Sequence, residues 1–214
     1  MTDRPALSRE RIIDAAARVA DDRGLSGVSM RNVGTELGVE AMSLYHHLSG
    51  KDALLDDLAD WVFTGIELPD LGQPWRSAMM QRASSSRARL SAHPWALGLI
   101  ESRRNPGPAL LHHHDTVLGC LRTNGFTVGL AAHAFSAIDA YVYGFVLTEL
   151  NLPMEPGEGA AEMVAEMGLP SDRYPHLAEM MAEQVLGRSY DYGDEFDFGL
   201  GLILDGLEEK LAER

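Results

Sequence analysis

The stretch from Ser29 to Leu55, SMRNVGTELGVEAMSLYHHLSGKDALL, constrains the fold of this chain more than any other. Ser29 is a residue type that begins helices, and Val33 and Leu37 follow it at helical spacing. Gly38 comes directly afterwards, as expected of a helix C-terminus or a sharp turn. The pattern therefore predicts one short helix followed by a corner.

A second short helix is expected to open at Ala41, with Leu44 and Leu48 directed inward. Its outward residues are then Met42, Ser43, Tyr45, His46 and His47. This face is unusual for a surface helix, because no acidic residue lies between Glu40 and Asp52. Two helices, a small-residue turn and an exposed second helix predict a helix-turn-helix that places its second helix in the DNA major groove.

The spaced residues around this unit resemble the tetracycline-repressor (TetR) family. The resemblance rests on a leading helix at Ser8 to Arg23, Gly24, Gly27 to Ser29, Leu37-Gly38-Val39, Leu44, Tyr45, His47, Lys51, Leu54 and Leu55. It covers about the first 60 residues. Beyond them, AHPWALGLIESRR, LRTNGFT, DAYVYGFVLTELNLP and the last helix resemble, more weakly, the effector domain of the tetracycline-repressor branch.

The charge balance argues against a coat that binds any DNA sequence. The formal net charge of the 214 residues is -14, and residues 1 to 60 hold 7 Lys plus Arg against 11 Asp plus Glu. A sequence-blind DNA coat would be basic throughout. We therefore expect phosphate contacts from a local face carrying Arg4, Arg9, Arg31 and Lys51, and a dependence on dimerisation.

The cysteine count and the hydropathy pattern exclude other classes. Cys120 is the only cysteine, so neither a disulfide framework nor a multi-thiolate zinc site is expected. No N-terminal signal segment and no uninterrupted apolar run of about 18 residues occurs. We expect a cytoplasmic protein with no cofactor and no metal.

The rest of the chain predicts an all-α protein. A connector helix is expected at Lys51 to Leu68, ended by Pro69 to Pro74. Further helices are expected at Trp75 to Ala92, Trp95 to Glu101, Ala109 to Thr123, Val128 to Leu150, Ala160 to Met167, Pro175 to Gly187 and Glu195 to Ala212. We place a three-helix DNA-binding domain at residues 1–48 and a larger ligand-binding and dimerisation domain at 49–214.

The final helix has two interpretations. Its apolar stripe and its glycines consist of Phe196, Leu200, Ile203, Leu207 and Leu211 with Gly199 and Gly206. Either this helix is buried within one subunit, or it pairs with Val128 to Leu150 and their twofold mates in a four-helix dimer interface, as the family resemblance implies.

Each candidate DNA contact has its own chemistry. Arg31 can reach a phosphate or a guanine edge, Met42 a thymine methyl group, and Ser43 a base or phosphate. His46 can stack on a sugar or contact a base. The resemblance implies backbone contacts for Tyr45 and His47, and Lys51 at a helix N-terminus suits phosphate. The alternatives are a merely solvated Arg31 and a Tyr45 that packs across the turn.

The effector pocket is less well defined by the sequence. Large apolar candidates are Trp61, Trp95, Phe135, Tyr143, Met163, Met167 and Met180, each of which also fits ordinary core packing. Asp139 is a carboxylate in an apolar helix, so it either bonds another helix or orients a polar group of the ligand. Consecutive His112, His113 and His114 allow a metal site as an alternative to surface and core roles.

These residues predict a ligand-responsive transcriptional regulator, acting as a repressor. It would bind a palindromic operator as a homodimer and be released by a small, largely apolar effector. One alternative is a dimeric helical ligand-binding module without DNA function. An enzyme is the other, but no nucleophile elbow, phosphate loop or paired-carboxylate motif occurs, so no enzyme activity is expected.

Overall fold

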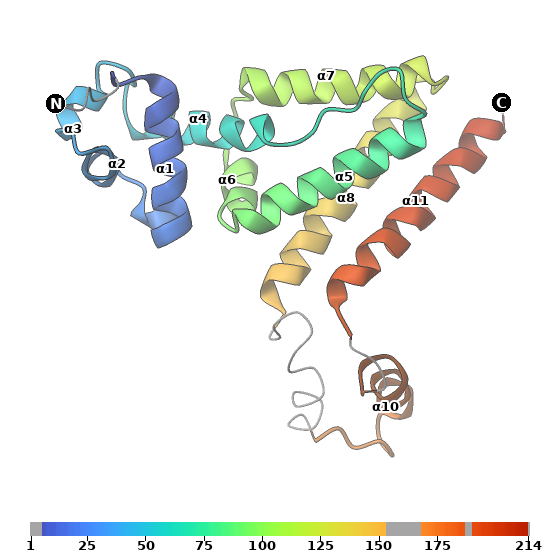
Figure 1. Cartoon of the computed structure of the whole chain (residues 1–214). Helices are drawn as coiled ribbons and strands as arrows, with labels where there is room; N and C mark the ends of the chain where they lie inside the picture. The colour runs from blue at the N-terminus through green and yellow to red at the C-terminus, as the bar shows by residue number, and fades with distance from the viewer. Residues whose placement is uncertain (1–5, 153–167, 187–189, 214) are drawn as a thin grey trace. The chain divides into compact units, whose positions relative to one another are not determined.

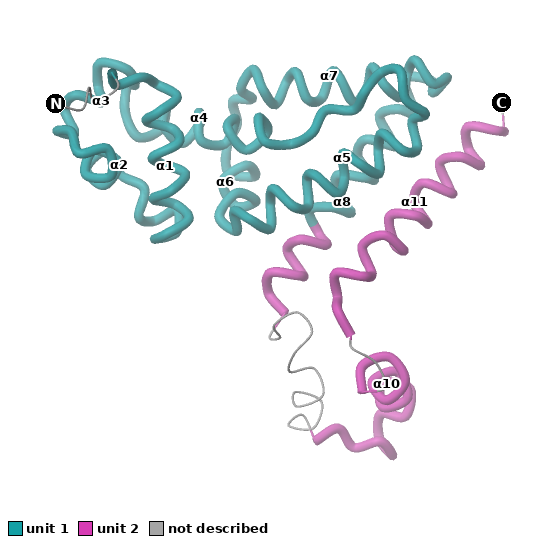
Figure 2. The backbone as a smooth tube through the Cα atoms, in the orientation of Figure 1, with its two compact units in different colours: residues 1–143 teal, residues 144–214 magenta. Residues whose placement is uncertain are grey.

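The structure is a computed structural model that describes residues 6–152, 168–186 and 190–213, and every regular element in those ranges is helical (Figure 1). Residue contacts divide the chain into two compact units, 1–143 and 144–214 (Figure 2). The expected all-α fold is confirmed. The functional boundary expected near residue 48 stays a prediction, because the division into units follows chain contacts alone.

Three helices form the N-terminal head. They are α1 (Arg9–Arg23), α2 (Met30–Leu37) and α3 (Ala41–Leu44), with a 3-10 turn at Leu25–Gly27. The Ser8 hydroxyl accepts a hydrogen bond from the Arg11 N–H at 3.3 Å, and the Ser29 hydroxyl accepts one from the Asn32 N–H at 3.1 Å. Both serines are thus the predicted N-caps, since each satisfies an otherwise free N–H of the first turn.

Two glycines shape the corner between α2 and α3. Gly38 has φ 65°, the left-handed conformation that closes α2. Gly34 permits a close crossing, because a Cβ atom there would lie 2.9 Å from the Val39 carbonyl oxygen. Leu44 and Leu48 are buried as predicted. The corner is therefore built by small residues and held by leucines.

Helix α4 (Lys51–Thr64) ends four residues before the predicted Leu68. Gly65 stops it, and the Gly65 N–H bonds the carbonyls of Val62 and Phe63 as the last turn closes. The Asp60 carboxylate accepts hydrogen bonds from the N–H groups of Ala109 and Leu110, at 3.1 and 2.9 Å. Helix α4 therefore starts in the head and is hydrogen-bonded to a helix that follows later in the chain.

Four further helices follow in the chain. They are α5 (Trp75–Ala92), α6 (Ala96–Ser102), α7 (Pro108–Thr123) and α8 (Val128–Asn151), all within one residue of the predicted bounds. Their core includes the buried side chains of Met79, Leu90, Leu121 and Ile138. The apolar stretch of α8 meets the length and composition of a membrane span. It also carries Asp139, which forms an ion pair with buried Arg82, so this part of α8 packs against protein.

The second unit contains the end of α8, α10 (Pro175–Met180), a π-helical turn (Met181–Leu186), a 3-10 turn (Tyr192–Asp194) and α11 (Glu195–Ala212). Phe145 stacks on Tyr192 with ring centroids 4.7 Å apart and meets the Phe196 ring edge-on at 5.0 Å. The last helix has the predicted bounds. The helix expected at Ala160 to Met167 lies outside the described residues.

Candidate DNA-binding face and effector site

The predicted outward residues of the recognition segment lie on the surface. Met42 is 72% exposed and Tyr45 47% exposed, and His46 is exposed as well. Ser43 and His47 are half-buried. The regular helix ends at Leu44, after which a turn carries the chain to Leu48. The segment thus exposes a thioether, a phenol and an imidazole. Helix α3, where it begins, lies at the edge of the head (Figure 1).

Ion pairs sort the basic residues of the head into two groups. Arg18 pairs with Glu36 at 2.8 Å, and Arg23 with Asp22 at 3.0 Å. Arg31 and Lys51 are exposed and form no ion pair with any described residue. These two cations therefore remain available to a phosphate.

The expectation that Arg9 meets DNA phosphate needs correction. Its guanidinium grips the Asp57 carboxylate with two hydrogen bonds of 2.6 and 2.7 Å, joining α1 to α4. These hydrogen bonds raise the pKa of Arg9 above its ordinary value. Arg9 is therefore a tie between helices. Arg4, the other N-terminal candidate, lies outside the described residues.

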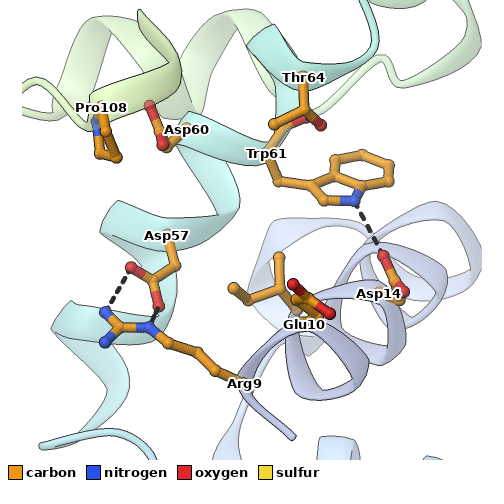
Figure 3. A pocket seen from close by; sticks show the side chains of 9 residues that line it. Arg9, Glu10, Asp14, Asp57, Asp60, Trp61, Thr64 and Pro108 are labelled. Atoms are coloured by element: carbon orange, nitrogen blue, oxygen red, sulfur yellow. Dashed lines mark hydrogen bonds and ion pairs between the residues drawn. The ribbon is translucent and has the colours of Figure 1, made fainter. Parts of the chain in front are cut away.

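The same ion pair borders a surface cleft of about 760 Å³ between α1 and α4 (Figure 3). Trp61 lines it, and the indole Nε1 donates a 3.0 Å hydrogen bond to Asp14. The acids that line the cleft mostly have partners already, since Asp57 binds Arg9 and Asp60 binds the start of α7. The polar groups around the cleft therefore link α1 to α4 and α4 to α7.

Trp61 and Trp95, two predicted pocket residues, belong to an aromatic cluster beside α1. Their rings stack with centroids 6.3 Å apart, and the Arg89 guanidinium lies 3.7 Å from the centre of the Trp61 ring. Burial lowers the pKa of Arg89. Trp95 donates a hydrogen bond to Asp21 on α1. The positions of both tryptophans thus favour a structural role at the junction of head and core.

Asp139 bonds another helix, which is the first of the two roles that its position in the sequence allowed. Its Oδ1 lies 2.5 Å from Nη2 of Arg82 on α5, and the Arg82 side chain is 2% exposed. The Arg82 Nε–H donates to Nε2 of His113 at 3.2 Å. Ser86 is buried one helical turn after Arg82 on the same face of α5, and we call Arg82, Ser86, His113 and Asp139 the inner polar cluster. A buried charge of this kind is tolerated because it is paired and hydrogen-bonded.

Phe135 and Tyr143 flank the inner polar cluster. The Phe135 ring meets His114 edge-on at 4.7 Å, and the Arg82 guanidinium carbon is 5.8 Å from its centroid. Burial raises the pKa of the Tyr143 phenol, and the Asp139 carboxylate adds to this effect. Met163 and Met167 lie outside the described residues, and Met180 is exposed.

The three consecutive histidines point to different surroundings. His112 is exposed, His114 is half-buried, and His113 is 1% exposed. Burial in the first place, and the positive charge of Arg82 in the second, lower the pKa of His113 to about 3. Within the described ranges, no three His, Cys, Asp or Glu side chains are placed to hold a metal ion.

The sequence did not point to Arg82 or Ser86, and for His113 it left a core role, a surface role and a metal site as alternatives. In the sequence, Arg82 is one of four arginines from Arg76 to Arg89 and has no distinguishing neighbour. Its partner lies 57 positions away. The isolated carboxylate of Asp139 was the available signal, since a buried acid implies a buried base.

The residues predicted for a dimer interface on α11 fall into two groups. Phe196, Leu200 and Leu207 are buried within the single chain, so their side chains are not free for a partner. Gly199 and Ile203 are half-buried and Gly206 is exposed. The exposed large apolar side chains of this helix are Phe198 and Leu202, at 68% and 60% exposed.

Two family models match the chain. Residues 12–58 match the one described as bacterial regulatory proteins, tetR family, and residues 68–211 the one described as tetracyclin repressor-like, C-terminal domain. The chain belongs to the tetR family. This TetR-family protein is a transcriptional regulator, and the expected recognition is confirmed.

Relatives of this TetR-family protein match it over nearly the whole length of the chain. It is 37% identical to the HTH-type transcriptional repressor DrrR1 of Streptomyces coeruleorubidus, over 99% of this chain and 81% of that protein. It is 29% identical to the class D tetracycline repressor protein of Escherichia coli, over 96% and 91%. It also resembles the structure of apo ActR from Streptomyces coelicolor, with TM-score 0.78, 27% identity and 98% of both chains covered.

Proposed function

We propose that this TetR-family protein is a homodimeric repressor that reads a palindromic operator with two copies of the segment 29–51. A small effector bound beside the inner polar cluster would release it. The regulator acts in the cytoplasm and catalyses no reaction. Related regulators are named as repressors, and ActR from Streptomyces coelicolor was also solved in complex with actinorhodin, at 27% identity.

The DNA-binding part of the proposal rests on the basic side chains of the head that form no ion pair with a described residue. Arg18 and Arg23 form ion pairs with nearby carboxylates. Arg31 and Lys51 flank the exposed segment and form no ion pair with a described residue. Phosphate contacts of this kind fix the position of a recognition segment on DNA. Met42, Ser43, Tyr45, His46 and His47 then have to supply base and backbone contacts.

The effector part rests on helix α4. Lys51 starts this helix in the head, and Asp60 near its other end bonds the N-terminus of α7. Arg103, which follows α6, forms a further ion pair with Asp56 at 3.2 Å. A ligand that displaces α6 or α7 would therefore move α4 and the heads with it. The ligand has to favour one head spacing over the other, because equal affinity shifts no population.

Dimerisation is assigned to the exposed apolar side of α11. Phe198 and Leu202 are four residues apart and therefore share one face of the helix. In unit 2, Leu147 on α8 is a further exposed apolar residue, at 58% exposed. Isologous pairing across a twofold axis would cover such faces.

DNA binding can be tested by fluorescence anisotropy on the intergenic DNA beside the gene for this protein. Arg31→Ala and Lys51→Ala should each weaken binding by about 1–3 kcal/mol and reduce the salt slope by about 1 per head, hence about 2 per dimer. Arg18→Gln is the matched control, since this arginine is paired with Glu36. Equal losses for Arg18 and Lys51, or no specific binding at all, would refute the proposal.

A further inference from the structure

We infer that the effector presents a hydrogen-bond-accepting oxygen, as a carbonyl or a carboxylate, to the inner polar cluster. This inference deepens the proposed function, because it names the chemistry of the ligand that the proposed function requires. Four buried side-chain polar atoms have no hydrogen-bond partner among the described residues, and three of them belong to this cluster: Arg82 Nη1, Ser86 Oγ and His113 Nδ1. All three side chains are at most 3% exposed.

The bonding of Arg82 leaves one corner of its guanidinium free. Nε donates to His113 and Nη2 donates to Asp139, so one edge of the planar group is fully engaged. Nη1 lies at the opposite corner. A guanidinium carries only donors and is always protonated, so whatever satisfies Nη1 has to be an acceptor.

The same argument fixes the tautomer of His113. Because Arg82 can only donate, Nε2 of His113 is the acceptor in their 3.2 Å hydrogen bond. The ring is neutral, as its lowered pKa of about 3 also requires, so the proton is on Nδ1. Nδ1 is therefore a second buried donor, and Ser86 adds a hydroxyl that can donate as well.

Unsatisfied buried donors are costly, by roughly 1–3 kcal/mol each, and native structures contain few of them. Three in one cluster therefore point to a ligand that accepts hydrogen bonds there. The charges of Arg82 and Asp139 cancel within the cluster, and His113 is neutral. The site thus accommodates either a neutral carbonyl or a carboxylate, whereas an ammonium group would bring more donors to a place that lacks acceptors.

Helix α8 provides the open side of the cluster. Phe135, Asp139 and Tyr143 are spaced by four residues, so they share one face, and all three are partly exposed. Ala134, Ile138 and Val142 form the neighbouring buried face. The rings of Phe135 and Tyr143 suit a flat apolar body, so the ligand is expected to be an aromatic compound with its oxygen directed at Arg82 and His113.

Four probes that share a naphthalene ring test this chemistry on the full chain at pH 7. They are 2-acetylnaphthalene, 2-naphthoate, 2-ethylnaphthalene and 2-naphthylmethylamine, with Kd values measured by isothermal titration. The ketone or the carboxylate should bind at least tenfold more tightly than the ethyl compound, and the winner identifies which oxygen the site prefers. Equal binding of the ethyl compound, or tightest binding of the amine, would overturn the inference.

Substitutions then locate the preference in the cluster. The double variant Arg82→Met with Asp139→Leu removes both charges together, so that no lone charge stays buried. It should lose the preference for oxygen while retaining helical circular dichroism. Arg76→Met on the same helix is the control and should retain the preference. An unchanged preference in the double variant would refute the assignment.

A milder variant covers the case in which the double variant does not fold. Ser86→Ala removes a hydroxyl that has no partner among the described residues, so it should fold normally and weaken the oxygen probes by about threefold to tenfold, the value of one hydrogen bond. No weakening, with wild-type binding of every probe, would count against the inference. Probe binding needs no DNA, so oxygen selectivity without operator binding would refute the proposed function and leave this inference intact.

Discussion

The indole Nε1 of Trp95 donates a 2.7 Å hydrogen bond to the carboxylate of Asp21, although the two residues are 74 positions apart. The same carboxylate oxygen lies 2.8 Å from Nδ1 of His93. Asp21 belongs to α1, whereas His93 and Trp95 occupy the corner between α5 and α6. One carboxylate therefore holds the DNA-binding head to the helices behind it.

Removing this carboxylate should loosen the head. Asp21→Ala deletes the acceptor of two hydrogen bonds, so we expect a loss of about 1–2 kcal/mol in the free energy of unfolding, measured with urea. Asp22→Ala is the matched control, because the one ion pair that Asp22 forms among the described residues is with exposed Arg23, so the change in stability should be about 0.5 kcal/mol or less. Equal effects at the two positions would show that the contact adds no stability.

The turn between α2 and α3 should not tolerate a methyl group at Gly34. The new Cβ would lie 2.9 Å from a backbone oxygen, so Gly34→Ala has to open the corner. We expect a loss of about 1–3 kcal/mol in stability and at least tenfold weaker operator binding. Gly98→Ala on α6 meets open space and should stabilise the protein by up to about 1 kcal/mol. Wild-type behaviour of Gly34→Ala would contradict the packing described.

A charge on the exposed side of α11 should separate the subunits. Phe198→Glu is expected to weaken dimerisation by about 2 kcal/mol or more, with helical circular dichroism unchanged. Leu111→Glu on α7 places the same charge at a 54% exposed leucine of unit 1, outside the proposed interface, and should remain dimeric. Sedimentation velocity distinguishes the two. A dimeric Phe198→Glu protein would exclude this face as the interface.

The neutral imidazole of His113 should make stability fall on acidification. Its folded-state pKa of about 3 lies below the ordinary value of 6.5. Between these two pH values the unfolded chain therefore binds a proton that the folded chain does not bind. Its contribution is complete above pH 6.5 and is lost between pH 6.5 and about 3, at about 1.4 kcal/mol per pH unit. His113→Gln keeps an acceptor for Arg82 but does not titrate.

Urea unfolding at pH 7.5 and pH 5.5 checks this prediction. Between these values the wild type should lose about 1.4 kcal/mol more than His113→Gln, because only the wild type has this proton to bind in the unfolded state. His114, whose pKa burial also lowers, is common to both proteins and cancels in the comparison. Parallel pH dependences would mean that His113 is not held neutral.

Local chemistry made most of the helices predictable. Ser8 and Ser29 cap their helices, and Gly38 closes α2, because each acts on backbone groups within a few residues. The end of α4 was predicted too late, at Leu68, because apolar residues continue past Thr64. Gly65 ends the helix there, and no apolar pattern marks that position.

The candidate sites also differ in whether local sequence or tertiary packing defines them. The sequence by itself determined the exposed segment from Met42 to Lys51, since its anchors Leu44 and Leu48 and its polar face follow from helical periodicity alone. Only the tertiary structure decided that Arg9 is held by Asp57, that Trp61 and Trp95 brace α1, and that Asp139 meets Arg82 and His113. Such pairs join residues that are distant along the chain, and a buried charge finds its partner only when the helices pack.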